Sequence, residues 1–426
     1  MSLPKLSLSA LKRNLQVNAT RPGEIRAILV GVNSGQANFT ESMSELYLLT
    51  QAAGSVPLES IVAKRDKPDP ALFIGSGKVT EIEARMNEID AEIAIFNHPL
   101  SPAQQRNLER ALGHHVIDRT GLILDIFAQR AKSHIGKVQV ELANVRYRMS
   151  RLVRAWSHLE RQKGGIGLRG GPGETQMELD RRMLENKSKR LQIDLEKLQR
   201  QQANQRRSRV KREVLSISLV GYTNAGKSTL FNALTKAGTY AADQLFATLD
   251  TTTRRIYLPE HGNVVISDTV GFIRELPHQL VEAFQATLDE TVHADLLLHV
   301  VDAASPVRDE QILEVEKVLE EIGAQNIPVI LVMNKIDQLP EYVGRGPEIR
   351  YDKEGGVSKI YLSAQKGQGI DLLREVLTTI AQDTDKIRDQ VRNKVNTSLS
   401  LEERPLTADY VEGLKQLNVG YIPRDI

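Results

Sequence analysis

Hydrophobic and polar positions alternate in two ways along residues 25–128. Short apolar runs, EIRAILVGV, PLESIVAK, ALFIG and AEIAIFN, are separated by segments in which apolar residues recur with helical spacing. Strands that alternate with helices form a parallel sheet covered on both faces, so we expect an N-terminal parallel α/β domain here. Ser101 and Gln104, on either side of Pro102, predict a capping box at the start of one helix.

The stretch Gly75-Ser76-Gly77-Lys78 in this domain resembles the end of a phosphate-binding loop. A Walker A sequence needs a glycine five residues before Gly77, and Leu72 stands there. We interpret the stretch as a turn from a strand into a helix.

Residues 129–212 predict two long helices joined by a bend at 164–174, GGIGLRGGPGE. Apolar residues of the first helix are spaced alternately four and three apart, which keeps one seam toward a partner helix: Val138, Leu142, Val145, Met149, Leu152, Trp156 and Leu159. Those of the second repeat every seven residues: Met177, Leu184, Leu191 and Leu198. A capping box is expected at Thr175 and Glu178, and a helix continuous from 176 to 206 would be about 45 Å long. The pattern predicts an antiparallel helical hairpin.

The positive charge of the chain is concentrated in this hairpin. The 426 residues carry a formal net charge of +2, but residues 130–213 hold 22 Lys and Arg against nine Asp and Glu, which leaves −11 for the rest. A merely solvated helix face mixes both signs. The surplus predicts an anionic partner, either nucleic acid or a membrane surface.

Composition excludes several other classes of protein. The chain has no cysteine, which excludes disulfides, thiolate metal sites and cysteine nucleophiles and fits a cytoplasmic location. No run approaches the ~18 to 20 apolar residues of a transmembrane helix, so we expect no stable membrane insertion. Residues 1–24 are expected to be a disordered leader, although the absence of acidic residues from 1–23 is also a feature of organelle transit peptides.

A third unit, residues 213–382, contains a phosphate-binding loop. The apolar strand VLSISLV and the helical STLFNALTKA flank a match to G-x-x-x-x-G-K-S: Gly221, Tyr222, Thr223, Asn224, Ala225, Gly226, Lys227 and Ser228. Backbone N–H groups of such a loop surround phosphate oxygens, while Lys227 reaches the β- and γ-phosphates and the Ser228 hydroxyl ligates Mg²⁺.

The next motifs supply the rest of the expected phosphate and magnesium site. The apolar run VVISD ends at Asp268, which we expect to hold Mg²⁺ through water, and DTVG continues through Thr269 and Val270 to Gly271, whose N–H can bind the γ-phosphate. A second hydroxyl for the metal must come from the preceding switch segment. Spacing alone leaves four candidates: Thr248, Thr251, Thr252 and Thr253.

The sequence NKID, after the strand PVILVM, predicts selectivity for guanine: Asn334, Lys335, Ile336 and Asp337. The Asp337 carboxylate can accept both N1–H and N2–H of guanine, and adenine offers neither donor. Hydrogen bonds to a charged acceptor contribute about 1.5 to 3 kcal/mol each, so the pair favours GTP over ATP by orders of magnitude. The base pocket is completed by Ser363, Ala364 and Gln365.

Phe272 follows Gly271, at the position where small signalling GTPases generally carry a glutamine that orients the attacking water. Phenylalanine cannot hydrogen-bond water, so intrinsic hydrolysis should be slow and should depend on a partner that completes the site. Alternatively, Phe272 only packs the switch, and another residue of this chain orients the water. Lys227 and Gly271 remain the expected catalytic groups.

The order of an α/β domain, a basic hairpin with GGIGLRGGPGETQ, and then GYTNAGKST, FATLD, DTVGF, NKID and SAQ resembles the HflX family of translation-associated GTPases over residues 25–380. In this family FATLD is the switch I signature, which selects Thr248 among the four threonines: Phe246, Ala247, Thr248, Leu249 and Asp250. The resemblance implies binding of the large (50S) ribosomal subunit, a hairpin tip directed at rRNA, and splitting of stalled or idle ribosomes, notably in heat stress.

The glycines of the hairpin tip can be interpreted with this resemblance. Residues 165–170 fit G-x-G-x-x-G, but they lie between two predicted helices and not after a strand, which argues against a dinucleotide site. A turn alone needs about two or three glycines, and this bend has six beside Pro172. We expect its bare backbone and two cations to contact RNA: Lys163, Gly165, Gly167, Arg169, Gly170 and Gly171.

The sequence therefore predicts an α/β protein with a P-loop GTPase domain of mostly parallel sheet, an N-terminal parallel α/β domain and a long antiparallel helical hairpin. We expect a monomeric, Mg²⁺-dependent GTPase that binds GTP and GDP and splits ribosomes. The alternatives are a GTP-gated assembly factor of the large subunit and a GTPase that acts at membranes, although the polar tip lacks an interfacial anchor. We expect residues 383–426 to form a short tail, where the family that the chain resembles carries a longer C-terminal domain.

Overall fold

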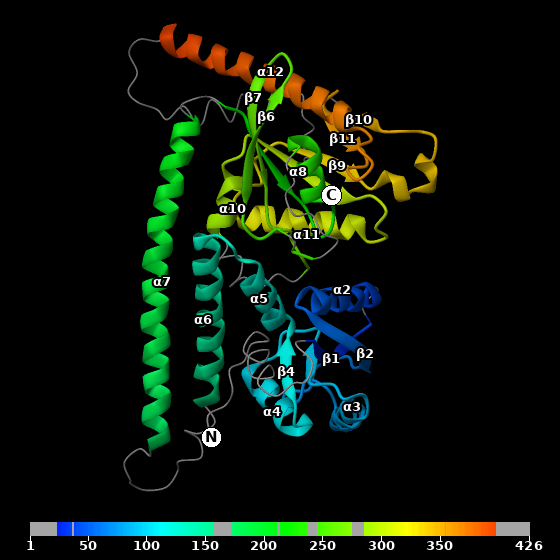
Figure 1. Ribbon diagram of the computed structural model, residues 1–426, viewed down its shortest axis with the longest axis vertical. Coiled ribbons are helices and arrows are strands. Elements are labelled where there is room, and N and C mark those ends of the chain that lie inside the picture. Colours follow the sequence, from blue (N-terminus) through cyan, green and yellow to red (C-terminus); the bar gives the residue numbers. More distant parts are fainter. Residues whose placement is uncertain are drawn as a thin grey trace. The chain divides into compact units, whose positions relative to one another are not determined.

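The computed structural model describes residues 24–35, 38–156, 172–210, 214–236, 245–246, 248–274, 285–353 and 355–397 (Figure 1). The chain divides into two compact units, which we describe separately. The first comprises residues 1–199 with 276–284, and the second comprises residues 200–275 with 285–426. In the described part of the chain, no helix is both long and apolar enough to cross a bilayer.

The first unit is built on a four-stranded sheet in the order β2-β1-β3-β4, and every strand pair is parallel. Its strands are β1 (Ile25–Asn33), β2 (Ser55–Lys64), β3 (Ile93–Phe96) and β4 (His115–Asp118). Its helices are α2 (Phe39–Ala52), α3 (Ser76–Ile89), α4 (Pro102–Leu112) and α5 (Arg119–Arg130). Apolar side chains of α3 and α4 form one core with β1 and β3. The predicted parallel α/β arrangement is confirmed.

Three local predictions in this unit can be compared with the structure. The capping box of α4 is present, because the Ser101 hydroxyl accepts from the backbone of Gln104 and the Gln104 side chain accepts from the backbone of Ser101. The run ALFIG is not a strand. Asp69 accepts hydrogen bonds from the backbone N–H groups of residues 71 and 72, and Phe73 has a left-handed φ of 65°, so the chain turns here. Gly75 then precedes α3 as its N-cap, as expected for a turn into a helix.

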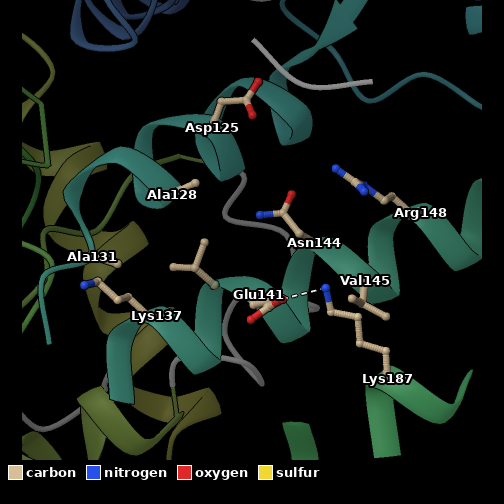
Figure 2. A pocket seen from close by; sticks show the side chains of 10 residues that line it. Asp125, Ala128, Ala131, Lys137, Glu141, Asn144, Val145, Arg148 and Lys187 are labelled. Carbon is tan, nitrogen blue, oxygen red and sulfur yellow. Dashed lines mark ion pairs between the residues drawn. The ribbon is translucent and has the colours of Figure 1, made fainter. Parts of the chain in front are cut away.

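Two long helices follow, α6 (His134–Trp156) and α7 (Pro172–Val210). The predicted seam positions Val138, Leu142 and Val145 are buried in α6, and Leu191 is buried in α7. Lys187 of α7 forms a 2.6 Å ion pair with Glu141 of α6 beside a cavity of about 250 Å³ (Figure 2). Residues 164–171 of the predicted bend lie outside the described residues, and residues 172–174 are helical and belong to α7, so the hairpin remains a prediction.

The beginning of α7 corrects the expected capping box. The helix starts at Pro172, so Thr175 lies inside it and cannot be its N-cap. Proline favours the first helical position because its fixed φ suits a helix and its missing N–H is not needed there. At 39 residues, α7 is about 58 Å long.

A buried carboxylate fixes α6 to the sheet of the first unit. Asp118, at the end of β4, is 1% exposed and accepts hydrogen bonds from the Tyr147 hydroxyl at 2.8 Å and from Arg151 at 2.6 Å. It also accepts from the backbone N–H groups of Leu100 and Gly121. Burial raises the pKa of Tyr147 well above its ordinary value, and the Asp118 charge adds to this effect. One side chain therefore joins β4, α5 and α6.

The second unit contains a seven-stranded sheet in the order β10-β11-β9-β8-β5-β7-β6. Its strands are β5 (Ser216–Val220), β6 (Thr252–Leu258), β7 (Gly262–Asp268), β8 (Leu296–Asp302), β9 (Val329–Asn334), β10 (Glu348–Tyr351) and β11 (Val357–Tyr361). Only the edge strands β6 and β10 are antiparallel to their neighbours among the strands described. This mostly parallel sheet confirms the expected fold class.

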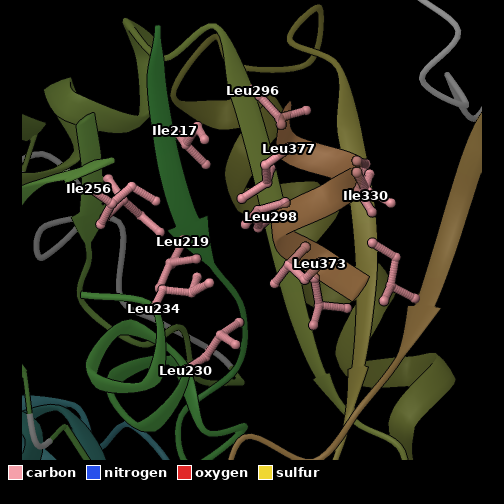
Figure 3. Close-up of a cluster of buried hydrophobic side chains, with 14 of the residues drawn as sticks. Ile217, Leu219, Leu230, Leu234, Ile256, Leu296, Leu298, Ile330, Leu373 and Leu377 are labelled. Atoms are coloured by element: carbon pink, nitrogen blue, oxygen red, sulfur yellow. The ribbon is translucent and has the colours of Figure 1, made fainter. Parts of the chain in front are cut away.

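Helices cover the sheet of the second unit: α8 (Lys227–Thr235), α10 (Gln285–Val292), α11 (Arg308–Glu321) and α12 (Ile370–Thr397). Short 3₁₀ turns occupy Ile336–Gln338 (η2) and Pro340–Tyr342 (η3). Leu230 of α8 and Leu373 and Leu377 of α12 pack with Leu219 and Leu298 of the sheet in one buried cluster (Figure 3). This core fixes the loops at the carboxyl ends of the strands.

The expected domain boundaries remain predictions, but two of them fall inside helices. Residue 128 lies in α5 and residue 382 lies in α12, which continues to Thr397. The periodicity of the sequence does not separate the last helical turns from the polar residues that follow. The expected leader, apart from Glu24, and most of the expected tail lie outside the described residues.

Candidate nucleotide-binding site

A cavity of about 520 Å³ lies at the carboxyl edge of the seven-stranded sheet, where ligands of open α/β sheets bind. Loops that follow β5, β7, β9 and β11 contribute to its wall. Its lining combines the predicted phosphate, magnesium and guanine motifs: Thr223, Asn224, Gly226, Lys227, Ser228, Thr229, Phe246, Thr248, Thr269, Gly271, Asn334, Lys335, Asp337, Gln338, Ser363 and Gln365. The fold therefore brings together motifs that are up to about 140 residues apart in the sequence.

The phosphate-binding loop connects β5 to α8, as predicted. Gly221 has a φ of 146°, and a side chain there would meet the Val300 carbonyl oxygen at 2.2 Å. Gly226 has a φ of 95°, and a side chain there would meet the Asn334 amide at 2.2 Å. Both positions therefore require glycine.

Lys227 is buried at the start of α8, and its ammonium group donates to the carbonyl oxygens of Gly221 at 3.0 Å and Tyr222 at 2.9 Å. Burial lowers the pKa of Lys227 to about 8, and the charge of Asp268 partly opposes this shift. A phosphate oxygen is a stronger acceptor for this cation than two neutral carbonyls. The arrangement favours an anion in the cavity.

Oxygens of Ser228, Thr248 and Asp268 lie within hydrogen-bond distance of one another near the N-terminus of α8. The Ser228 hydroxyl lies 2.7 Å from one oxygen of Asp268 and 2.7 Å from the Thr248 hydroxyl, which is 2.9 Å from the same carboxylate oxygen. The other carboxylate oxygen of Asp268 is buried and has no partner among the described residues. Burial raises the pKa of Asp268, although Lys227 and the two hydroxyls oppose the shift. Oxygen donors in this arrangement suit a hard divalent cation.

The structure separates Thr248 from the other candidate threonines of the switch segment. Thr252 and Thr253 lie in β6, where the Thr253 hydroxyl is 3.0 Å from that of Ser267. Thr251 directly precedes the strand. Of the four candidates, only Thr248 contacts Asp268 through its hydroxyl in the described hydrogen bonds.

The guanine motif is held by contacts among its own residues. The Asn334 side chain donates to the Ala225 carbonyl and accepts from the Ala364 N–H, both at 2.9 Å, so it joins the phosphate loop to the base loop. Asp337 accepts a 2.6 Å hydrogen bond from the Ser363 hydroxyl and is otherwise exposed to the cavity. This geometry leaves carboxylate lone pairs of Asp337 for two donors on one edge of a base.

Sequence reasoning missed Asp302, which lies at the end of β8. Its carboxylate forms a 2.7 Å ion pair with Lys335, and it thereby fixes a residue that lines the cavity and has a left-handed φ of 65°. The signal was present, because an acidic residue ends the apolar run LLLHVVD just as Asp268 ends VVISD.

Phe272 is 1% exposed, and its side chain belongs to the protein core. Its backbone forms a parallel bridge with the phosphate loop: its N–H donates to Gly221 at 3.1 Å, and its carbonyl accepts from Thr223 at 2.7 Å. The buried ring carries no donor or acceptor that could orient a water at the phosphates.

The other residues predicted for the nucleotide site differ in how far they are buried. Phe246, Leu249, Thr269, Val270, Ile336 and Ala364 are buried, and Gln365 lines the cavity. Asp250 is half-buried. Ala247 and the RNA-contact residues 163–171 lie outside the described residues.

Known proteins share this organisation. Three family models match consecutive parts of the chain: GTP-binding GTPase N-terminal at residues 40–128, GTP-binding GTPase middle region at 130–209, and 50S ribosome-binding GTPase at 216–335. GTPase HflX of Escherichia coli K12 is 54% identical over 353 residues, which cover 83% of this chain and 82% of that protein. The chain belongs to the HflX family.

The chain is also similar to a second HflX protein and to a solved structure. GTPase HflX of Magnetococcus marinus is 48% identical over 341 residues, which cover 80% of this chain and 78% of that protein. A crystal structure of SsGBP with GDP is 25% identical, with a TM-score of 0.48 over 84% of this chain and 98% of that one. As an HflX-family member with a P-loop GTPase domain, the protein is a GTPase of a ribosome-associated, GTP-binding family.

Proposed function

We propose that this HflX-family GTPase binds the large ribosomal subunit through its basic helices and the 164–174 tip, and that it splits stalled or idle ribosomes in the cytoplasm. One observation carries this proposal: α7 exposes cations that no acidic side chain neutralises within the described residues. Arg182, Lys189 and Arg190 are exposed and have no ion pair there, whereas Arg181 is paired with Glu185.

Two of these cations, Arg182 and Lys189, lie on the face of α7 that points away from its buried seam. Arg182 and the buried Leu191 are nine residues apart, which is half a turn out of phase at 3.6 residues per turn. Lys189 follows Arg182 by seven residues and therefore lies on the same face, about 10 Å further along the axis. A row of unneutralised cations on one helix face is suited to the phosphates of RNA.

The tip extends this proposed RNA contact. Its glycines would let backbone approach rRNA closely, and Lys163 and Arg169 would bind phosphates. If the helices and tip make six to ten phosphate contacts, affinity should fall by about 10³ to 10⁵ between 50 and 200 mM salt, on the scale of duplex DNA.

Mg²⁺ is the proposed cofactor of the GTPase site. Ser228, Thr248 and Asp268 would hold it, Asp268 through water, and the unpartnered oxygen of Asp268 fits such a role. When bound, the metal would neutralise charge on the β- and γ-phosphates. GTP would then order the segment at Thr248 and the N–H of Gly271, and loss of the γ-phosphate would release both.

Sedimentation of purified 70S ribosomes with the full chain and a non-hydrolysable GTP analogue tests the proposal. We expect free subunits, with the protein in the large-subunit fraction. Intact ribosomes, together with an effect confined to immature large subunits, would instead favour the assembly factor. We also propose that the protein acts as a monomer, and light scattering would test this.

A charge-matched pair of variants tests the RNA-facing helix. Arg182→Glu with Lys189→Glu should weaken large-subunit binding by at least tenfold and leave GDP affinity unchanged. Lys64→Glu with Lys67→Glu makes the same change of net charge at exposed positions of the N-terminal unit and serves as the control. Equal binding by both double variants, or binding independent of ionic strength, would contradict an RNA contact through α7.

A further inference from the structure

The GTPase site lacks a side chain in the usual place for orienting the attacking water. Phe272 is buried and cannot do so. Another polar group must therefore contact the water if this chain hydrolyses GTP by itself. That group has to lie near both Lys227 and Gly271, because these residues flank the expected position of the γ-phosphate.

Most hydroxyls that line the cavity already have partners. Ser228 and Thr248 face each other and Asp268, Thr269 donates to the Leu219 carbonyl at 2.6 Å, and Ser363 donates to Asp337. Thr223 differs from these. Its side chain is 6% exposed and lines the cavity, but its hydroxyl has no hydrogen-bond partner among the described residues.

Thr223 lies at the point where the phosphate loop meets the switch that follows β7. A methyl group placed on Gly271 would lie 2.8 Å from Cγ2 of Thr223 and 3.0 Å from the ammonium nitrogen of Lys227. The three residues therefore surround one small space. The N–H of Thr223 donates to the Phe272 carbonyl at 2.7 Å, which fixes the threonine beside Gly271.

An unpartnered buried hydroxyl costs about 1 to 3 kcal/mol, so a polar partner in the working state would remove this cost. A hydroxyl offers one donor and two acceptor positions. It can donate to a γ-phosphate oxygen and accept from a water molecule at the same time. Those are the two hydrogen bonds that a glutamine amide would make.

We propose that Thr223 is a catalytic residue that orients the attacking water in place of the glutamine. The water oxygen forms a bond to the γ-phosphorus as the bond from phosphorus to the β,γ-bridging oxygen breaks, and GDP leaves with that electron pair. One proton of the water passes to an oxygen of the released phosphate, and the other stays on the oxygen that has joined the phosphorus. Thr223 donates to a γ-phosphate oxygen throughout and neither gains nor loses a proton.

The test uses the full chain and compares Thr223→Val, which keeps the shape and lacks the hydroxyl, with Thr223→Ser, which keeps the hydroxyl. Single-turnover hydrolysis of GTP and the affinity for GDP are measured for each. We expect Thr223→Val to slow hydrolysis by about 10- to 100-fold and Thr223→Ser to stay within about threefold of the parent. GDP affinity should be unchanged, because GDP has no γ-phosphate.

Thr379→Val, at an exposed position of α12, serves as the matched control and should change neither quantity. If Thr223→Val hydrolysed GTP at the rate of the parent, the proposal would be overturned. An equal loss in the valine and serine variants, or a parallel loss of GDP affinity, would also overturn it, because these results would indicate a packing role.

Discussion

Asp337→Asn should reverse the base preference of the nucleotide site. The carboxylate is exposed to the cavity and is oriented by the Ser363 hydroxyl, which donates to one of its oxygens at 2.6 Å. In the variant, the amide oxygen would take that hydrogen bond, and the amide NH₂ would face the base. A donor would then oppose the N1–H and N2–H donors of guanine.

The expected magnitude follows from the bonds that are lost. Two hydrogen bonds to a charged acceptor contribute about 1.5 to 3 kcal/mol each, so their loss weakens GDP binding by about 3 to 6 kcal/mol, or roughly 10² to 10⁴ in affinity. Xanthine carries a carbonyl where guanine carries its amino group, and this carbonyl can accept from the new amide. Binding of XDP should therefore become stronger than binding of GDP.

Calorimetric titration of the nucleotide-free full chain with GDP and XDP measures both affinities. Asp309→Asn, which removes a largely exposed carboxylate from the first turn of α11, is the matched control and should leave both affinities unchanged. If Asp337→Asn bound GDP within threefold of the parent, the carboxylate would not be the guanine acceptor, and the reasoning from NKID would be wrong.

Three further predictions concern other parts of the two units. Gly271→Ala places a methyl group 2.8 Å from the Thr223 side chain. We therefore expect titrations to show that the variant loses at least tenfold more affinity for a non-hydrolysable GTP analogue than for GDP. Tyr147→Phe removes a buried donor to Asp118 and should cost about 1.5 to 3 kcal/mol, measured as faster hydrogen exchange of α6 amides; unchanged exchange would contradict this role. Burial lowers the pKa of His299 from 6.5 to about 3 in the folded protein. Between these pH values the unfolded state binds more protons than the folded state, so the free energy of unfolding decreases as the pH falls from 6.5 to 3. The slope is at most about 1.4 kcal/mol per pH unit, and His299→Leu should flatten it in thermal unfolding scans from pH 7 to 5.

The nucleotide motifs could be predicted from sequence because their chemistry requires particular residues at particular spacings. Gly221 and Gly226 illustrate this, since each has a positive φ and a neighbour that would clash with any side chain. The mostly parallel sheets were predictable for a similar reason, because buried strands of this kind are almost continuously apolar. Thr248 was different: four nearby threonines were equivalent by spacing, and only the family resemblance selected the one that contacts Asp268.

What sequence reasoning could not supply depends on contacts across the fold. The run ALFIG is apolar enough for a strand, but a turn closed by Asp69 outweighs that tendency. The N-cap expected at Thr175 fails because a proline three residues earlier is a better first residue for the helix. The partnerless hydroxyl of Thr223 becomes visible only when the hydrogen bonds of its neighbours are known.

Phe272 combines a side chain buried in the core with a backbone that is bonded to the phosphate loop. Its ring is anchored in the core, and its backbone bonds to Gly221 and Thr223 hold Gly271 against the phosphate loop. A glutamine at this position whose side chain pointed to the water would not be buried in the core. The protein would then lose the free energy of burying an apolar side chain of this size, about 1.5 to 3 kcal/mol. In this chain Phe272 therefore fixes the N–H of Gly271 beside the phosphate loop, and orienting the water is left to another group. The same backbone bridge holds Thr223 next to Gly271, which is the position that the proposed role of Thr223 requires.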